Sequence, residues 1–428
     1  MTAPFRIAIA GLGTVGIGLV RILQTHPEMI AARAGRPVEI AAVSARSKDK
    51  DRGADLSAYA WEDDPVALAK RPDIDLFVEV MGGHEGAARE ATEAALKAGH
   101  HVVTANKALL AHHGNAIAAA AEEAGVALRF EAAVAGGIPV IKALTEGLAG
   151  NEIRRVLGVM NGTCNYILTK MEETGQGYNA LFEECARLGY LEADPNLDVG
   201  GIDAGHKLSL LAAIAFGTAV DFDAVELEGI QSITLEDIRQ AADMGYKIKL
   251  LGVAQMTGRG LEQRMSPCLV PDTSPLGQLD GGTNMVVIEG DAVGQIVLRG
   301  AGAGAGPTAS AVLGDIIDVA RGFRLPAFGQ PAASLRKVRA ARAAVPAPYY
   351  LRMALADKPG ALAKIAACLG EAGISIDRMR QYGHQEGVAP VLIVTHKTTR
   401  SALDEAVAAF SDTGVLEGTP VAIRIENV

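Results

Sequence analysis

Cysteine is scarce in this sequence, and its spacing excludes two common roles. The 428-residue chain has four cysteines, with no CxxC pair and no histidine cluster beside any of them. Such spacing fits neither a disulfide framework nor a zinc site, so we expect reduced and mostly buried thiols. The four are Cys164, Cys185, Cys268 and Cys368.

The sequence also lacks a basic excess and any long uninterrupted apolar run. Its formal net charge of -10 at pH 7 argues against nucleic-acid binding. Mean hydropathy is positive at +0.19, yet no stretch approaches the roughly 18 apolar residues of a membrane span. The first expected strand begins near Phe5, which leaves no room for a signal or transit peptide. We therefore expect a cytoplasmic protein without nucleic-acid or membrane partners, and its length predicts two or three domains.

A glycine-rich loop near the N-terminus predicts a dinucleotide-binding domain. Arg6–Ala10 has the composition of a strand, and the loop GLGTVG follows it and opens an apolar helical pattern. The three glycines permit a tight turn, close approach of the pyrophosphate and close helix–strand packing. Further expected strands alternate with helices, which predicts a parallel sheet covered on both faces. These strands are Glu39–Ser44, Asp75–Val80 and His100–Thr104, and the candidate cofactor contacts in the loop are Gly11, Gly13, Thr14, Val15 and Gly16.

The end of the second expected strand indicates which dinucleotide fits. An acid at this position binds the ribose hydroxyls of NAD, whereas a basic residue accommodates the additional phosphate of NADP. The segment reads Ala45-Arg46-Ser47-Lys48, with no acid before Asp49. Because Arg46 and Ser47 can hold a 2′-phosphate through charge-assisted hydrogen bonds, we prefer NADP to NAD. A solvated charged loop is the alternative.

Three polar segments in the middle of the chain carry candidate reacting groups. Thr104–Ala108 follows an expected parallel strand, at the end where ligands of such sheets lie, and contains Lys107. Asn161–Leu168 passes from polar residues into an apolar run, which is typical of a loop that enters a helix. Tyr190–Leu208 is rich in Pro, Gly and acids before it turns apolar. We expect these segments to contribute to one site.

The third segment places acids and a lysine at informative spacings. Asp203 and Lys207 are four residues apart, so on a helix they share a face and can interact. Glu192 and Asp198 suit a cationic amino group on a substrate. A capped helix with a surface ion pair is the alternative for this pattern.

Two other mechanisms stay open at this point. Cys164 could act as a nucleophile with His206 as its base, which would make the chain a phosphorylating semialdehyde dehydrogenase. Alternatively, a redox-sensing regulator could bind the dinucleotide without chemistry. The acidic balance and the density of reacting groups between 190 and 207 count against a regulator.

Seven segments, in order, resemble the homoserine dehydrogenase family. The resemblance implies reversible, NAD(P)-dependent interconversion of L-aspartate 4-semialdehyde and L-homoserine, a step in threonine, methionine and isoleucine biosynthesis. Several motifs in family order are harder to obtain by chance than any one alone. The segments are GLGTVG, VEVMGG (Val78–Gly83), TANKALLA (Thr104–Ala111), FEAAVAGGIP (Phe130–Pro139), NGTCNYIL, LEADPNLDVGGIDAGHKL and GAGAGPTASAV (Gly302–Val312).

The resemblance also implies roles for individual residues. Lys207 is the implied acid/base for the substrate hydroxyl, Lys107 lies beside it, and Asp203 orients Lys207 or the substrate. The implied substrate contacts are Glu192, Asp198, Asn161, Gly162 and Thr163. The implied further cofactor contacts are Met81, Gly82, Gly83, Thr104, Lys107 and Gly302. The family's monovalent-cation site (Na+ or K+) corresponds to Glu131 and to backbone carbonyls around Val134, Gly136 and Ile138.

The C-terminal part reads as strand, helix, strand, strand, helix, strand. Alternating apolar residues in Leu351–Leu355 precede a D-K-P-G turn, and helical spacing follows the turn. This βαββαβ pattern resembles an ACT domain, a small-ligand sensor that usually pairs with a second copy. We therefore predict inhibition by L-threonine, with a module that serves only dimerisation as the alternative. The candidate ligand contacts are Asp357, Gly360, Gly373 and Ile374.

Together these patterns predict an α/β chain with three units and a linker. We expect it to form a homodimer or homotetramer and to act on a small amino-acid substrate. The units are a discontinuous Rossmann-type dinucleotide-binding domain at 1–133 plus about 305–335, an α+β catalytic and dimerisation domain at 134–304, a linker at 336–348, and an ACT-like domain at 349–428.

Overall fold

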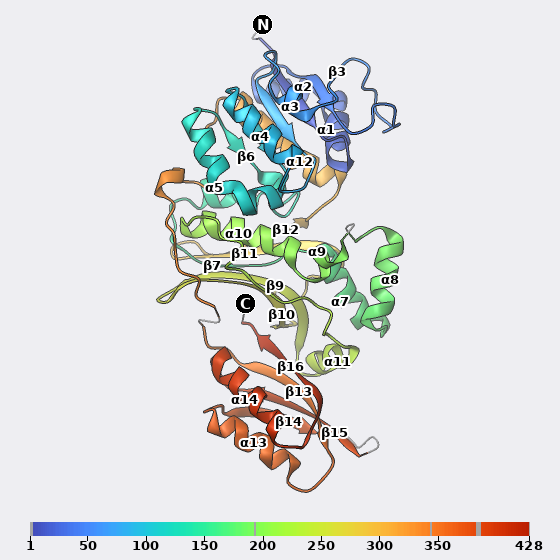
Figure 1. Ribbon diagram of the computed structural model, residues 1–428, viewed down its shortest axis with the longest axis vertical. Coiled ribbons are helices and arrows are strands. Elements are labelled where there is room, and N and C mark those ends of the chain that lie inside the picture. The colour runs from blue at the N-terminus through green and yellow to red at the C-terminus, as the bar shows by residue number, and fades with distance from the viewer. Residues whose placement is uncertain (1–2, 192–193, 343–344, 382–386, 428) are drawn as a thin grey trace.

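Two sheets carry the fold, one of six strands and one of ten. The computed structural model describes residues 3–191, 194–342, 345–381 and 387–427. The molecule is elongated, with the N-terminus at one end, while the C-terminus returns to the middle beside the central sheet (Figure 1). Within the described ranges no helix is long and apolar enough to cross a membrane.

The six-stranded sheet is parallel and has the order β3-β2-β1-β4-β5-β6. This is the Rossmann order, and each of the four strands predicted from the sequence is confirmed to within one residue. Helix α12 belongs to this layer although it comes much later in the chain, since a Cβ on Gly18 of α1 would lie 2.7 Å from the Ala305 carbonyl oxygen. The elements are β1 (Phe5–Ala10), α1 (Thr14–Thr25), α2 (Pro27–Ala34), β2 (Val38–Ser44), β3 (Ala60–Trp61), α3 (Pro65–Ala69), β4 (Leu76–Glu79), α4 (Ala87–Lys97), β5 (His101–Thr104), α5 (Lys107–Glu123), β6 (Leu128–Arg129) and α12 (Ala305–Ala320).

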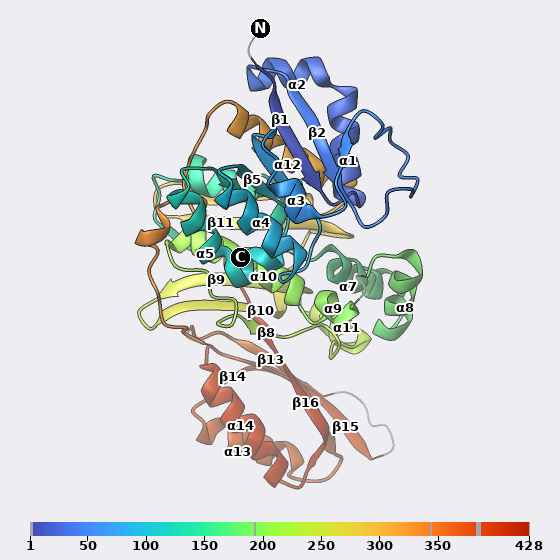
Figure 2. The same cartoon turned by 45° about the horizontal axis from the view of Figure 1, so that its top comes forward.

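The middle of the chain builds an antiparallel sheet covered by helices on the side of the Rossmann layer (Figures 1 and 2). The Pro- and Gly-rich part of the Tyr190–Leu208 segment contains a short helix, because Asp194 caps it and Pro195 suits its first turn. The elements are η1 (Glu131–Ala133), α6 (Val140–Lys142), η2 (Ala143–Gly147), β7 (Ile153–Val159), α7 (Gly162–Thr174), α8 (Tyr178–Leu188), α9 (Pro195–Val199), α10 (Ile202–Phe216), β8 (Glu226–Leu227), α11 (Leu235–Asp243), β9 (Tyr246–Thr257), β10 (Gly260–Pro271), β11 (Thr283–Gly290) and β12 (Gly294–Ala301).

The C-terminal βαββαβ unit does not stand apart as a separate module. Its last strand pairs with its own first strand on one side and with β10 on the other, so the middle sheet continues into it. Arg264 and Glu426 form a buried ion pair across this junction. The elements are η3 (Ala332–Ser334) before the unit, then β13 (Tyr349–Ala356), α13 (Ala361–Glu371), β14 (Ile376–Gln381), β15 (Val388–Thr395), α14 (Arg400–Asp412) and β16 (Leu416–Ile425).

Candidate active site

Each glycine of the Gly11–Gly16 loop has different surroundings. Gly11 has a φ of 102°, and a Cβ on Gly16 would lie 1.9 Å from the Gly11 carbonyl oxygen. By contrast, nothing lies within 4 Å of a Cβ placed on Gly13, which begins α1 without a side-chain cap. The first N–H groups of α1, from Thr14 and Val15 onward, thus have no side-chain acceptor. Open space in front of uncapped N–H groups fits a pyrophosphate.

This contrast predicts opposite outcomes for two alanine substitutions. Gly16→Ala should lower the melting temperature, because its Cβ cannot fit beside Gly11. Gly13→Ala should leave the melting temperature unchanged, since its backbone is extended at φ -80° and ψ -158°. It should nevertheless raise KM for the dinucleotide about tenfold or more, because the added Cβ occupies the open space that fits the pyrophosphate. Tenfold corresponds to a loss of about 1.4 kcal/mol in binding free energy. Thermal unfolding and steady-state kinetics measure both effects, and an unchanged KM in Gly13→Ala would contradict this use of the loop.

A buried acid shapes the turn that faces this loop. One oxygen of Glu79 accepts from the N–H groups of Met81 and Gly82 at 2.8 and 3.2 Å, and the other accepts from the Thr104 hydroxyl at 2.6 Å. Burial raises the pKa of Glu79 above its ordinary value. Asn106 completes the turn by donating to the carbonyl oxygen of Gly83 at 2.6 Å. Neither Glu79 nor Asn106 was predicted as a site residue, although a buried acid ahead of a Gly-Gly turn is a usable signal.

One carboxylate contacts both candidate catalytic lysines. Lys107 begins α5 and Lys207 lies in α10, and their nitrogens are 2.9 and 2.6 Å from different oxygens of Asp203. Lys207 also donates to the Met160 carbonyl oxygen at 2.7 Å. Burial alone would raise the pKa of Asp203, but the charges of Lys207 and Lys107 outweigh it and hold that pKa below its ordinary value. The carboxylate is therefore ionised at neutral pH and fixes the two amines side by side.

The N-terminus of α7 meets the same carboxylates. Asn161 caps this helix by accepting from the Cys164 N–H at 2.8 Å. Its amide nitrogen donates to Asp198 at 2.9 Å and to Asp203 at 3.4 Å. The structure therefore brings Asn161, Asp198 and the two lysines of the predicted site into one network.

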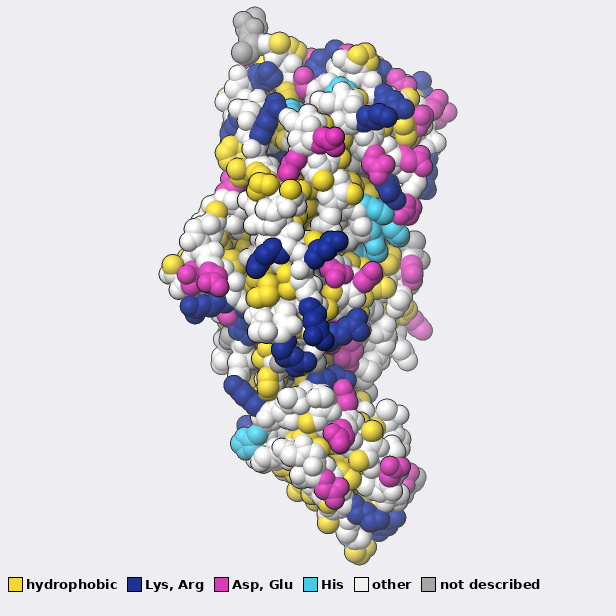
Figure 3. Space-filling view, turned by 60° about the vertical axis from the view of Figure 1, so that its left-hand side comes forward, with side chains coloured by type: hydrophobic (Ala, Val, Ile, Leu, Met, Phe, Trp, Pro, Cys, Tyr) yellow, Lys and Arg dark blue, Asp and Glu magenta, His cyan; other side chains and the backbone are white. Residues whose placement is uncertain are grey.

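A cavity of about 580 Å³ connects the Rossmann turn with this network. Two histidines missed by sequence reasoning lie along it, because no sequence pattern marks them. The rings of His84 and His112 are 4.4 Å apart, and His206 follows at 5.5 Å from His112. Figure 3 shows histidine side chains gathered where the N-terminal domain meets the middle of the molecule. The cavity is lined by Val15, Val80, Met81, Gly82, Gly83, His84, Ala105, Asn106, Lys107, Ala108, His112, Leu197, Ile202, Asp203, His206 and Phe222.

The environment of Cys164 does not suit a nucleophile. The side chain is fully buried, and its thiol donates to the Asp198 carbonyl oxygen at 3.3 Å. Burial raises the pKa of this thiol well above its ordinary value, so the reactive thiolate is disfavoured. Burial and the neighbouring His112 lower the pKa of His206 to about 4. All four cysteines are free, and all but Cys368 are buried, as the sequence led us to expect.

The remaining predicted contacts are placed as follows. A Cβ on Gly162 would lie 2.6 Å from a backbone carbonyl oxygen, and the Thr163 hydroxyl donates to the Tyr190 carbonyl oxygen at 3.0 Å. Gly302 packs against Asn284, with a Cβ position 2.0 Å from its amide nitrogen, and does not line the cavity. Glu192 lies outside the described residues.

The loop expected to hold a cation has an unusual backbone. Ala135 and Gly136 follow one another with φ of 56° and 53°, and the loop is largely buried. Among the described residues, no backbone N–H group donates to the Val134 or Gly136 carbonyl oxygens, whereas the Ile138 carbonyl oxygen accepts from the Val140 N–H. Buried carbonyls without an amide partner fit a monovalent cation.

Glu131, the acid expected beside this loop, is already engaged. Its two oxygens accept from the N–H groups of Ile141 and Lys142 at 2.9 and 2.8 Å. Burial, followed by the nearby Asp315 carboxylate, raises the pKa of Glu131 to about 7. Among the described residues there is no cluster of three or more His, Cys, Asp or Glu side chains that could hold a metal ion.

Comparison with known proteins agrees with this geometry. The family described as homoserine dehydrogenase matches residues 139–317, its NAD-binding domain matches 11–131, and the ACT domain matches 349–414. A homoserine dehydrogenase of Pseudomonas aeruginosa is 44% identical over 99% of both chains. The crystal structure of a homoserine dehydrogenase from Thiobacillus denitrificans is 41% identical over 99% of both chains, with a TM-score of 0.93. A hyperthermophilic archaeal homoserine dehydrogenase mutant in complex with NADPH is 29% identical, covers 74% of this chain and 97% of its own, and has a TM-score of 0.63. The chain belongs to the homoserine dehydrogenase family of oxidoreductases, with a nicotinamide-dinucleotide-binding domain and a C-terminal ACT domain.

Proposed function

We propose that Lys207 is the acid/base of homoserine oxidation and that Lys107 assists it electrostatically. The observation that carries this assignment is the Asp203 carboxylate, which contacts both lysine nitrogens at the edge of the cavity. A nicotinamide dinucleotide held by the Gly11–Gly16 loop would supply the acceptor for the hydride that leaves the carbon bearing the substrate hydroxyl. In its neutral amine form Lys207 takes the hydroxyl proton and becomes an ammonium group. In the reverse direction the ammonium form returns this proton as negative charge grows on the aldehyde oxygen.

The amino end of the substrate is assigned to the acids beside α7. Asp198 is buried, and its carboxylate accepts a hydrogen bond from Asn161. It is therefore held in place for an ammonium group, and we assign Glu192 to the same role. Gly162 and Thr163 lie on the first turn of α7, next to Asn161. The hydroxyl end of the substrate would then point toward Lys207.

NADP is the cofactor that we prefer. Arg46 and Ser47 follow the end of β2, and the Ser44 carbonyl oxygen accepts from the Gly11 N–H at 2.9 Å, which places this segment beside the cofactor loop. The Arg46 side chain is exposed and forms no hydrogen bond or ion pair with the described residues. The archaeal relative in complex with NADPH supports the preference.

We expect Arg46→Ala to raise KM for NADP about tenfold while KM for NAD changes less than twofold. The arginine would lose a charge-assisted contact that only the 2′-phosphate can make, and tenfold corresponds to about 1.4 kcal/mol. Oxidation of L-homoserine with each cofactor, followed by absorbance of the reduced nicotinamide, measures both constants. The same assay tests the proposed activity itself. Equal changes for the two cofactors would assign Arg46 no part in the preference.

A monovalent cation, Na+ or K+, is proposed at the loop after β6. The Val134 and Gly136 carbonyl oxygens would hold it, with Ile138 and Glu131 beside them. Such an ion supplies positive charge that keeps the strained turn at Ala135 and Gly136 in place. The loop itself packs closely, since a Cβ on Gly136 would lie 2.5 Å from the Gly302 carbonyl oxygen.

L-threonine is the effector that we propose for the ACT domain. A cavity of about 200 Å³ lies at the turn after β13, with Asp357, Lys358 and Gly360 in its wall. Gly360 begins α13 in a left-handed conformation without a side-chain cap, which fits a carboxylate ligand. Gly373 and Ile374 lie beyond the far end of α13 and outside this cavity.

Saturating L-threonine should lower the rate of homoserine oxidation and raise the melting temperature. Ligand at 100 times its dissociation constant adds about 2.7 kcal/mol to the stability of the form that binds it. Asp357→Ala should abolish both responses and keep the rate without threonine. If threonine changes neither rate nor melting temperature in the full chain, the regulatory assignment is wrong.

We also propose a domain division, an oligomeric state and a cellular location. The domain division at 1–133 with about 305–335, 134–304, 336–348 and 349–428 is supported by the packing of α12 beside α1. A homodimer or homotetramer is supported by the outer strand β12, where Val297 is 39% exposed, and by Val293 just before this strand, which is also 39% exposed. A cytoplasmic location is supported by the four free thiols.

A further inference from the structure

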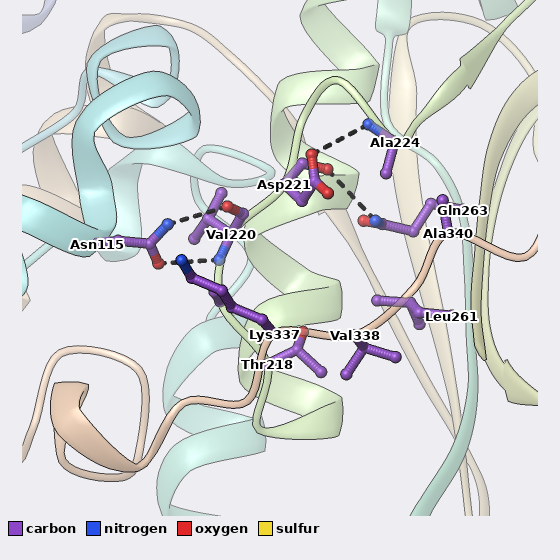
Figure 4. Close-up of a pocket in the computed structure, with 11 residues that line it drawn as sticks. Asn115, Thr218, Val220, Asp221, Ala224, Leu261, Gln263, Lys337, Val338 and Ala340 are labelled. Carbon is purple, nitrogen blue, oxygen red and sulfur yellow. Dashed lines mark hydrogen bonds between the residues drawn. The ribbon is translucent and has the colours of Figure 1, made fainter.

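A third hollow lies behind the active-site helices, where four segments of the chain meet. Its volume is about 210 Å³, and its walls come from α5, the segment after α10, β10 and residues 337–340 (Figure 4). Asn115 of α5 holds both backbone groups of Val220, donating to its carbonyl oxygen and accepting from its N–H, each at 2.9 Å. The hollow therefore lies at a joint between the Rossmann layer and the middle of the molecule.

Two buried polar atoms at this hollow have no hydrogen-bond partner among the described residues. They are the hydroxyl oxygen of Thr218 and the amide oxygen of Gln263, whose residues are 1% and 3% exposed. The amide nitrogen of Gln263 donates to the Asp221 carbonyl oxygen at 3.3 Å. This bond fixes the orientation of the amide, whose oxygen has no donor among the described residues. Because an unpaired buried acceptor is destabilising, such atoms mark the place of a missing donor.

Charged groups of both signs line the same hollow. The Lys337 ammonium forms no ion pair or hydrogen bond with any described residue, and it points toward Asn115 in Figure 4. Asp221 uses one carboxylate oxygen to accept from the Ala224 N–H at 3.2 Å, and its other oxygen is not engaged within the described chain. Apolar side chains such as Leu261 and Val338 form the remaining walls.

We propose that this hollow binds a small zwitterionic amino acid. The carboxylate of the amino acid pairs with Lys337, and its ammonium group donates to Gln263 and Asp221. The Thr218 hydroxyl either donates to the carboxylate or accepts from the ammonium group. The site is distinct from the substrate cavity and from the cavity of the ACT domain, because it shares no lining residue with them.

Two helices, α5 and α10, connect this site with the catalytic lysines. Asn115 stands eight residues beyond Lys107 on α5, or about 12 Å along the helix axis. Helix α10 carries Lys207 and ends at Phe216, two residues before Thr218. An amino acid that binds here and holds the Rossmann layer against the middle of the molecule should therefore raise the melting temperature and change KM for homoserine, independently of the ACT domain.

Titration calorimetry on the full-length protein tests the proposal with L-serine and L-lactate as probes. We expect L-serine to bind with a dissociation constant on the order of 1 mM, and L-lactate, which lacks the ammonium group, to bind at least tenfold more weakly. Lys337→Met changes an exposed position and does not threaten folding, and it should weaken the binding of L-serine at least tenfold. The double variant Thr218→Val with Gln263→Met should weaken this binding by a similar factor. Lys97→Met is the charge control, and Asp357→Ala, which alters the ACT cavity, should leave this binding intact.

Three results would overturn the proposal. One is no binding of L-serine up to 50-fold above the expected constant of about 1 mM, which would leave ordered water as the occupant. Another is equal binding by wild type and Lys337→Met. The third is binding that disappears in Asp357→Ala, which would assign the ligand to the ACT domain. None of these results bears on homoserine oxidation, which the cofactor assay tests separately.

Discussion

Replacing Lys207 with methionine is expected to lower kcat for L-homoserine oxidation by about a hundredfold or more. Methionine keeps most of the volume of the buried lysine stem but has no group that can take the hydroxyl proton, and general acid–base catalysis contributes on this scale. Lys207 is 8% exposed and forms hydrogen bonds to Asp203 and the Met160 carbonyl oxygen. Steady-state kinetics with saturating cofactor measures the loss. KM for the cofactor should change little.

Lys249 offers a matched control for the removal of a buried lysine. It lies in β9, is 2% exposed, and burial lowers the pKa of its ammonium to about 8. Its ammonium group donates to Asn165 and to the Leu279 carbonyl oxygen and lies 3.8 Å from the Asp280 carboxylate, and it does not line the cavity. Lys249→Met should therefore lower stability while kcat stays within a few-fold. If the Lys207→Met protein is folded and loses less than a few-fold in kcat, Lys207 has no part in proton transfer.

Local sequence signals were sufficient for most elements and for the core of the site. The strand predicted at Arg6–Ala10 is observed as Phe5–Ala10, because its apolar residues lead directly into the glycine-rich loop that ends it. The spacing of Asp203 and Lys207 correctly indicated a shared helix face. These features depend on neighbours within a few residues, which a single sequence displays directly.

Features that depend on distant contacts were not predictable from the sequence. The helix α12 begins at Ala305, and its glycine-containing first turn packs closely on Gly18 of α1, a contact that no local sequence pattern predicts. Cys268 pairs with Arg424 and so joins β10 to β16, two strands that lie far apart in the chain. No local sequence pattern predicts this pairing. Likewise, His112 lies beside His206 only because α5 packs on α10.

The second large effect is expected for Asp203→Asn, which keeps the shape of the side chain but removes its charge. The variant should be about 3–5 kcal/mol less stable at pH 7, since breaking a buried ion pair leaves an uncompensated charge. Here both Lys107 and Lys207 lose their shared partner. We also expect kcat to fall at least tenfold, because the two amines are no longer fixed side by side. Urea unfolding and steady-state kinetics measure the two losses.

The pH dependence separates an electrostatic role of Asp203 from a steric one. In the wild type the folded-state pKa of Asp203 lies below its ordinary value. Its contribution is therefore fully present above the unfolded pKa of about 3.9 and is lost as the pH falls toward the folded value. The stability difference between wild type and Asp203→Asn should be constant from about pH 8 to 5 and should narrow below about pH 4. A difference that persists unchanged at about pH 3 would mean that asparagine disturbs packing and that the charge of Asp203 does not hold the lysines.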